Sequence, residues 1–181
     1  MPIAFCQPIE EIEAAIASDR VTELAAVLAR LGRTGAFADP NLFAKPVDEH
    51  YARRLIWRHP QGRFVVVGMT WAPGQGTLLH DHSGLWGGEL VVGGAIREQT
   101  YVLLESEGGR HRFAASTTSV ATSGAVGVVA PPFEYHRIEN AGDDVAHTVH
   151  VYAGDLVRSR CFKKLEDGWY ESADVQLRYD A

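Results

Sequence analysis

The sequence has little cysteine: only Cys6 and Cys161 occur among its 181 residues, and they stand near opposite ends of the chain. Folds that depend on disulfide bonds use several cysteines at close spacing, so no disulfide framework is expected here. Unpaired cysteines are typical of proteins in a reducing compartment, and we therefore predict a cytoplasmic location.

Long apolar runs and clusters of basic residues are also lacking. We find no run of about 18 apolar residues, the length that a membrane span needs, and no charged-then-apolar leader after Met1. The net charge is −6 without any basic stretch, so neither nucleic acid nor an anionic membrane is expected as a partner. A small molecule is the expected partner, whereas the oligomeric state stays open.

The length and the 46% hydrophobic content suit one soluble domain with a sizeable core. We predict a single domain over residues 1–181, with a helical segment at about 8–32 and a β-barrel at about 51–165. The role of residues 167–171 stays open, because a lid and a packing strand would share the same pattern.

Helical periodicity is confined to residues 8–32. Pro8 suits the first position of a helix, and Ile9, Ile12 and Ile16 follow it at helical spacing. A second stripe of aliphatic side chains begins at Val21, and Gly32 is the predicted end of that helix. We expect two short helices that pack on the outside of a sheet.

The rest of the chain has the pattern of strands and turns. Short β-branched, aromatic or alternating runs, mostly separated by Gly, Pro, Asp or Asn, predict strands at 55–57, 64–71, 89–97, 99–105, 110–113, 127–130, 135–140 and 146–152. Many short strands at this spacing favour a sandwich or a barrel, so we predict an all-β fold.

Three histidines stand out within this pattern. His80 and His82 flank Asp81 at the end of a strand-like run, so their imidazoles point to one side while Asp81 points to the other. His136 lies in another such run and can face the pair if the sheet closes on itself. Three neutral imidazoles suit a divalent ion such as iron, nickel, copper or zinc. The alternative is that they are hydrogen-bonded side chains of the core.

The segment from residue 51 to 152 resembles the thiol dioxygenases of the cysteine dioxygenase family, in particular the bacterial type, within the cupin superfamily. The motifs that carry the resemblance are Trp71-x-x-Gly74-x-Gly76, His80-Asp81-His82, Gly94-x-x-Arg97-Glu98, His136-Arg137-Ile138-Glu139-Asn140 and Thr148-x-His150-x-Tyr152. The resemblance implies a cupin double-stranded β-helix, or jelly-roll barrel, in which His80, His82 and His136 bind Fe(II).

A possible proton relay follows from the last of these motifs. The side chains of Thr148, His150 and Tyr152 share one face of a strand, and they resemble the family's Ser-His-Tyr group with threonine in place of serine. The resemblance implies catalytic roles, with the histidine orienting the tyrosine hydroxyl toward the substrate and oxygen. A core tyrosine with a satisfied hydroxyl is the alternative, and His147 should face away.

Tyr51-Ala52-Arg53 resembles the family's Tyr-x-Arg motif, which implies that Tyr51 and Arg53 bind the substrate. An arginine can bind a carboxylate through two parallel hydrogen bonds. Relatives that act on 3-mercaptopropionate usually carry glutamine there, so the expected activity is Fe(II)-dependent oxidation of L-cysteine to cysteine sulfinate with O2. A 3-mercaptopropionate dioxygenase, a zinc or nickel enzyme and a non-catalytic metal-binding cupin stay open as alternatives.

Gly87 departs from two related patterns. Ordinary cupins place a glutamate at this position, and animal cysteine dioxygenases place there the cysteine that crosslinks to the relay tyrosine. Glycine supplies no metal ligand and forms no thioether with Tyr152. Glu89, two residues further on, reaches the metal if the glycines loop out, or else belongs to the next strand; the sequence leaves both open.

Overall fold

The computed structural model describes residues 6–132 and 134–180. Two helices come first, α1 (Cys6–Ala17) and α2 (Val21–Thr34), followed by a short 3-10 helix, η2 (Pro40–Leu42). Both α-helices lie where their periodicity places them, but α2 continues past Gly32 to Thr34. Gly32 lies within the helix and does not end it. A Cβ atom there would lie 2.8 Å from Leu90 Cδ1, so glycine at this position lets the helix approach the sheet closely.

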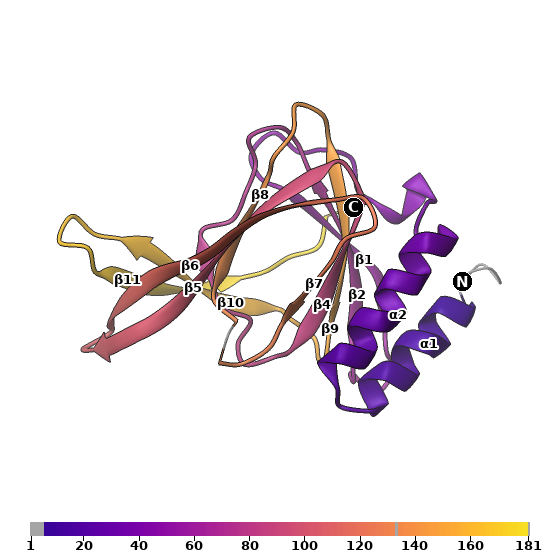
Figure 1. The fold of residues 1–181 in the computed structure, drawn as a ribbon, viewed down its shortest axis with the longest axis horizontal. Helices are drawn as coiled ribbons and strands as arrows, with labels where there is room; N and C mark the ends of the chain where they lie inside the picture. Colours follow the sequence, from indigo (N-terminus) through magenta and orange to yellow (C-terminus); the bar gives the residue numbers. More distant parts are fainter. Residues whose placement is uncertain (1–5, 133, 181) are drawn as a thin grey trace.

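Strands follow the helices along the rest of the described chain (Figure 1). They are β1 (Ala52–Arg58), β2 (Val65–Trp71), β3 (Leu79–His80), β4 (Gly87–Gly93), β5 (Ala95–Glu107), β6 (Arg110–Thr122), β7 (Val126–Val129), β8 (His136–Asn140), β9 (Ala146–Tyr152), β10 (Arg158–Lys164) and β11 (Tyr170–Gln176). The fold is all-β, with two antiparallel sheets and short N-terminal helices outside them, as predicted.

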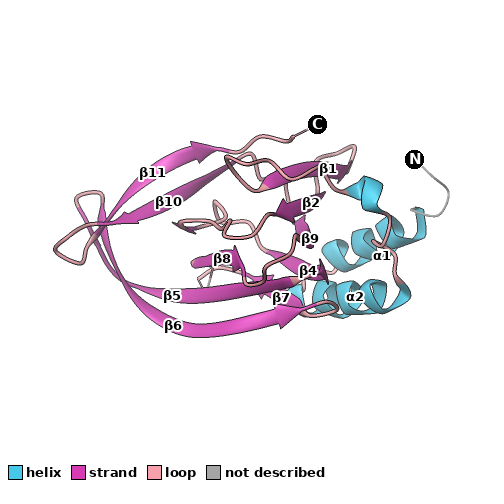
Figure 2. Cartoon of the chain, turned by 90° about the horizontal axis from the view of Figure 1, so that it is seen from above, coloured by secondary structure: helices cyan, strands magenta, loops and turns pink. Residues whose placement is uncertain are grey.

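The strands form two antiparallel sheets. The first has the order β1-β2-β9-β4-β7, and the second closes into a ring with the order β10-β11-β6-β5-β8-β3. The two helices lie against the five-stranded sheet, on the side away from β10 and β11 (Figures 1 and 2). Among the described residues, neither helix has the length and apolar character that crossing a bilayer requires.

Two apolar clusters hold these layers together, and β2 contributes to both. Val66 packs with the helices and the outer face of the sheet, whereas Val65 and Val67 pack with the interior of the barrel. The same alternation along β9 places Val149 and Val151 in the outer cluster and Tyr152 in the inner one. Both faces of the sheet are therefore packed against apolar side chains. This packing determines the side chains of β9 that face the barrel interior.

Several strand predictions need correction. The run at 89–97 is split into β4 and β5 at Gly94, whose φ of 75° suits glycine, and β5 then includes the predicted strand at 99–105. β6 extends to Thr122 instead of ending at Phe113, because its polar second half pairs with β5 along its length. β11 pairs with all of β10, so residues 170–176 form a packing strand beyond the predicted barrel range.

Candidate active site

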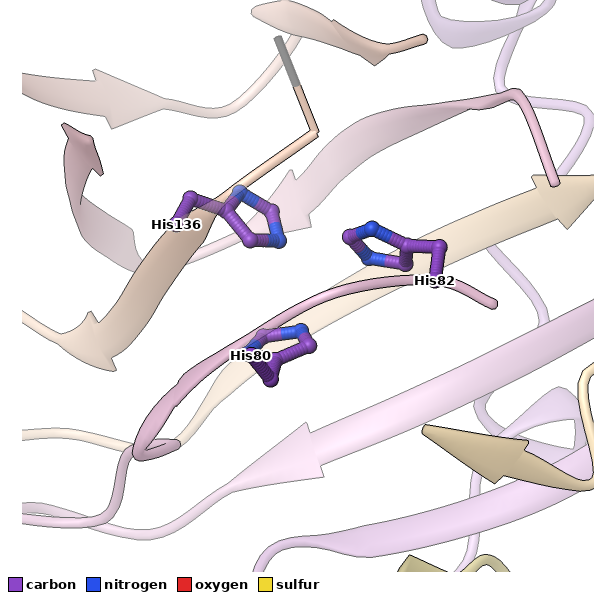
Figure 3. Close-up of side chains that lie close together, drawn as sticks. All are labelled: His80, His82 and His136. Carbon is purple, nitrogen blue, oxygen red and sulfur yellow. The ribbon is translucent and has the colours of Figure 1, made fainter. Parts of the chain in front are cut away.

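The three histidines lie together at the junction of β3 and β8. His80 is the register partner of His136 across these two strands, and His82 follows β3 by two residues. The ring centroids are 5.0 Å apart for His80 and His82, 4.8 Å for His80 and His136, and 4.9 Å for His82 and His136. Figure 3 shows the three rings facing a common point, with one nitrogen of each within 4.8 Å of the others.

Unpartnered nitrogens mark this group as a place for an ion. Among the described residues, the buried Nδ1 of His82 and Nε2 of His136 have no hydrogen-bond partner. Nδ1 of His80 lies 3.0 Å from the carbonyl oxygen of Leu78, which leaves its Nε2 for another partner. A buried polar atom without a partner costs about 1–3 kcal/mol, and a metal ion bound by all three imidazoles removes that cost.

Burial also sets the protonation of these imidazoles. Desolvation, followed by the neighbouring His136, lowers the pKa of His80 to about 3. The same two causes lower the pKa of His82 well below its ordinary value. Both rings are therefore neutral near pH 7, the form that offers a lone pair to a metal. The donor set fits a divalent metal of the kind that the sequence predicted.

Glu98 holds His136 from behind. Its Oε1 lies 2.7 Å from Nδ1 of His136, so the histidine donates its N–H to the carboxylate and directs Nε2 toward His80 and His82. A carboxylate behind a ligating histidine is a common arrangement in metal sites. Glu98 belongs to one of the motifs of the sequence, but its role could not be predicted, since nothing local shows that β5 pairs with β8.

Asp81 lies on the opposite side of its strand from the two histidines, as strand alternation predicts. Its buried carboxylate accepts hydrogen bonds from the backbone N–H of Arg160 at 3.0 Å and from its Nε at 2.7 Å. The backbone N–H of Ser83 is a third donor, at 3.1 Å. Asp81 therefore ties the histidine segment to β10 and stays outside the three-imidazole group.

A hydrogen-bonded chain runs along β9 next to the histidines. Nε1 of Trp71 donates to Oγ1 of Thr148 at 2.9 Å, Oγ1 lies 2.8 Å from Nε2 of His150, and Nδ1 of His150 lies 3.1 Å from the hydroxyl of Tyr152. The ring of Tyr152 is 5.7 Å from that of His82. The predicted relay residues are therefore in contact with one another and beside the imidazole group.

The donors in this chain fix its direction. An indole N–H can only donate, so Thr148 accepts from Trp71, and its own proton goes to its other partner among the described residues, Nε2 of His150. The proton of the neutral His150 ring must then be on Nδ1, which donates to Tyr152. The hydroxyl proton of Tyr152 is left free to point toward the imidazole group.

Burial keeps the relay uncharged. Desolvation lowers the pKa of His150 to about 3, with a further contribution from His136. Desolvation likewise raises the pKa of Tyr152 far above its usual value. Tyr152 is therefore a phenol and His150 a neutral imidazole near pH 7, so the relay can offer a neutral hydrogen-bond donor to a developing negative charge.

Glu89 lies in β4 and is not part of the three-imidazole group. Its Oε2 is 3.4 Å from Nδ1 of His150. A carboxylate oxygen of Glu89, one of Glu98 and a ring nitrogen of His136 all lie within 4.8 Å of one another. Burial raises the pKa of Glu89 to about 7. The sequence left open whether the glycines loop out and bring Glu89 to the metal, or whether Glu89 belongs to a strand. The structure favours the strand, because β4 begins at Gly87 and includes both glycines before Glu89.

Gly87 is at a point where two strands meet closely. A Cβ atom there would lie 2.3 Å from the carbonyl oxygen of Val151, so a side chain would require the backbone of β4 or β9 to shift. The same Cβ atom would lie 3.1 Å from Cδ1 of Tyr152, but glycine has no side chain that could bind a metal or crosslink to that ring. The absence of a carboxylate at residue 87 leaves the imidazole group without a negative ligand there.

A cavity of about 270 Å³ opens beside the imidazoles. Its lining includes His80, His136 and Tyr152, and it also includes both predicted substrate-binding residues, Tyr51 and Arg53. Tyr51 stacks on Trp71 with ring centroids 4.5 Å apart. Arg53 is only 4% exposed. One cavity is thus lined by two predicted metal ligands (His80 and His136), two relay residues (His150 and Tyr152) and both predicted substrate-binding residues. His82 and Thr148 are not among the residues that line it.

Comparisons with known proteins find one matching family and distant structural likenesses. The sequence model of the family described as cysteine dioxygenase type I matches residues 11–165. The chain is similar to a solved double-stranded β-helix protein from Klebsiella pneumoniae, with 18% identity, TM-score 0.49 and coverage of 63% of this chain and 80% of that one. The TT1209 protein from Thermus thermophilus has 19% identity, TM-score 0.46 and coverage of 64% and 94%. The family match is the comparison that bears on function.

Proposed function

The chain belongs to the cysteine dioxygenase type I family, and from that premise we propose that it is an Fe(II)-dependent dioxygenase that oxidises L-cysteine to cysteine sulfinate. Both atoms of O2 are added to the thiol sulfur, so that RSH and O2 give RSO2H. The observation that carries the proposal is the set of three imidazoles, of which His82 and His136 each have an unpartnered buried nitrogen among the described residues, beside a cavity that also contains a buried arginine.

His80, His82 and His136 would hold the iron through one nitrogen each. A bound ferrous ion supplies electrons and open coordination positions that bring a thiolate and oxygen together. Imidazoles also bind zinc, copper and nickel, so the choice of iron rests on the family. Glu98 keeps the ring of His136 in the orientation that binding requires.

Arg53 would bind the carboxylate of the substrate. No ion pair joins its guanidinium to a carboxylate among the described residues, although the side chain is buried. A buried cation without a counter-ion is costly, and an anionic substrate in the cavity would supply one. The ring of Tyr51 borders the same space. This arrangement supports a substrate with both a thiol and a carboxylate.

Tyr152 would act on the reacting atoms through its hydroxyl. Thr148 donates a hydrogen bond to His150, and His150 donates one to the hydroxyl oxygen of Tyr152. The proton of that hydroxyl is therefore available for a hydrogen bond inside the cavity. A fixed neutral donor stabilises negative charge as it develops, without the cost of reorganising solvent.

3-Mercaptopropionate is the second candidate substrate, because it has the same thiol and carboxylate but no amine. No acidic side chain lines the cavity in the described part of the chain, so the protein itself offers the cysteine amine no counter-ion. Cysteine would therefore depend on the metal to bind its amine. We place either activity in the cytoplasm, in keeping with the two free cysteines.

Oxygen uptake by protein loaded anaerobically with Fe(II) tests the proposal. L-Cysteine should be consumed with one O2 per thiol, and Arg53→Ala should raise its KM by about 10–100-fold because a charge-assisted contact is lost. Arg54→Ala is the matched control, since Arg54 does not line the cavity. No uptake with any thiol would leave a non-catalytic cupin, and much faster turnover of 3-mercaptopropionate would replace cysteine as the substrate.

A further inference from the structure

The guanidinium of Arg53 has few partners for a buried cation. Its Nη1 donates to the carbonyl oxygen of Arg178 at 3.3 Å, and its Nη2 donates to that of Leu156 at 3.4 Å. Both distances are longer than a typical N–H···O hydrogen bond of about 2.9 Å. A guanidinium has five N–H groups, so in the described part of the chain most of its hydrogen-bonding capacity is left for a carboxylate.

One face of this guanidinium is covered by an aromatic ring. Cζ of Arg53 lies 5.1 Å from the ring centroid of Tyr179, in the segment that follows β11. A cation at this distance from an aromatic ring is attracted to it, most strongly where water is excluded. Tyr179 therefore supports the Arg53 guanidinium in addition to its two long hydrogen bonds.

The ring of Tyr179 is itself held in place. Its hydroxyl donates to Oδ1 of Asp155 at 3.1 Å, and Oδ2 of Asp155 forms an ion pair with Arg58 at 2.9 Å. The guanidinium of Arg58 also lies over the ring, at 5.9 Å. These contacts limit how far the ring, and with it Arg53, can move.

The backbone beyond the ring is tied to the same strand. Asp180 accepts a hydrogen bond from the backbone N–H of Arg53 at 2.8 Å through Oδ2, and its own N–H donates to the carbonyl oxygen of Arg53 at 2.6 Å. The neighbouring Leu177 lines the cavity. The segment from Leu177 to Asp180 is thus bonded to the start of β1 through Asp180 and contributes Leu177 to the lining of the cavity.

We propose that Tyr179 is a specificity-determining residue, which positions the Arg53 guanidinium so that the cavity selects thiols that carry a carboxylate. This inference rests on the proposed function and deepens it. Tyr179 acts through Arg53 and does not touch the reacting atoms. It gives a role to the segment that follows β11.

L-Cysteine and cysteamine form the matched pair of substrates, since cysteamine is cysteine without the carboxylate. Tyr179→Leu removes the ring but keeps apolar bulk, and it should raise the KM for L-cysteine about tenfold with little change in kcat. The KM for cysteamine should stay within about twofold of the wild-type value. Tyr179→Phe keeps the ring and should restore most of the affinity for L-cysteine.

A double-mutant cycle separates positioning from general damage. In an Arg53→Ala background, Tyr179→Leu should have no further effect on the KM for L-cysteine, because the group that it positions is already gone. An equal rise in KM for both substrates in the Tyr179→Leu single variant, or full additivity with Arg53→Ala, would overturn the inference.

Binding to zinc-loaded protein separates this inference from the proposed function, since zinc has no redox chemistry. Calorimetry should show tighter binding of L-cysteine than of cysteamine, and Tyr179→Leu should reduce that difference about tenfold. If this holds while the iron-loaded protein consumes no oxygen, the dioxygenase proposal fails and the carboxylate site stands. If Tyr179→Leu leaves the difference intact, the role of Tyr179 is refuted.

Discussion

Two neighbouring groups of side chains in this barrel contain histidines, the three-imidazole group and the relay of Thr148, His150 and Tyr152, and they differ in how the imidazole nitrogens are used. In the first group, His82 and His136 each keep a nitrogen without a partner among the described residues. In the second, both nitrogens of His150 have side-chain partners, Thr148 and Tyr152. Burial lowers the pKa of His80 and of His150 to the same value of about 3, so neither burial nor protonation distinguishes a metal ligand from a relay residue.

The difference lies in the hydrogen-bond partners and in what each arrangement requires. Unpartnered nitrogens in a closed space are costly unless an ion binds them, whereas a fully partnered imidazole is stable and can hold a second group in a fixed orientation. The comparison therefore predicts that changes in the first group act on metal content, and that changes in the second act on turnover.

The largest effect is expected for His136→Ala. Losing one of three imidazoles should weaken metal binding more than about 100-fold, which exceeds the usual effect of residues behind the ligands. Metal analysis after dialysis should find little bound iron, and oxygen uptake should be abolished.

His147→Ala is the control for His136→Ala, because His147 is on β9 next to Thr148 but lies against the ring of Phe43 outside the cavity. It should keep its metal and most of its activity. Equal metal loss in both variants would show that the effect is not specific to the imidazole group.

Tyr152→Phe should act on turnover alone. It removes the hydroxyl donor but keeps the ring, so kcat should fall about 100-fold, the size expected for loss of one positioned donor. Metal content and the KM for L-cysteine should change little. Steady-state oxygen uptake and metal analysis on the same sample provide the test. A loss of metal would show that Tyr152 contributes to metal binding and not to turnover alone.

Glu98→Gln should weaken metal binding about 10–100-fold, since the neutral amide holds the N–H of His136 less strongly. Competition with a chelator measures the affinity. Glu105→Gln, which changes an exposed ion pair on the same strand, is the matched control and should bind metal normally. Unchanged affinity in Glu98→Gln would mean that the orientation of His136 does not depend on this carboxylate.

Thr148→Val should lower kcat about tenfold, because Nε2 of His150 loses its donor and the ring can place its proton there instead. Nδ1 would then accept the Tyr152 proton and turn the hydroxyl away from the cavity. Thr148→Ser keeps the donor and should retain near-normal turnover. If valine and serine behave alike, the direction assigned to the relay is wrong.

Acid should destabilise the metal-free protein. The folded pKa of His80 and of His150 is about 3 against an ordinary value of 6.5, so the unfolded chain binds more protons between these values. The contribution of these histidines to the free energy of unfolding is therefore complete above pH 6.5. It decreases as the pH falls below that value, by about 1 kcal/mol per pH unit for each histidine. Burial raises the pKa of Glu89 and Glu134, so these two act in the opposite direction.

Urea unfolding at pH 7, 6 and 5 measures this balance. The histidines outnumber the raised carboxyl groups, because burial also lowers the pKa of His82, so a net loss of stability is expected on acidification. Constant or rising stability would show that the imidazoles become protonated in the folded state, which would weaken their assignment as neutral ligands.

Local patterns explain how much of this site could be predicted from the sequence. Alternation along a single strand is enough to place Thr148, His150 and Tyr152 on one face, and a two-residue spacing is enough to pair His80 with His82. The meeting of His136 with that pair required the assumption of a closed sheet, which the ring of strands in the second sheet supports.

The features that sequence analysis missed depend on contacts between distant segments. The polar half of β6 is a strand because β5 lies beside it, and its own residues lack the apolar alternation that predicts a strand. Glu98 contacts His136, which lies 38 residues further along the chain. Tyr179 contacts Arg53 across about 126 residues. No local rule connects such pairs, so only the folded arrangement shows that they touch.

Isotope labelling tests the central claim most directly. Iron-loaded protein should convert L-cysteine under ¹⁸O2 to a sulfinate that carries two labelled oxygen atoms, and the His136→Ala variant should form none. Mass spectrometry of the product gives the answer. A sulfinate with one or no labelled oxygen, or disulfide as the only product, would contradict the proposal that the three imidazoles hold the iron of a thiol dioxygenase.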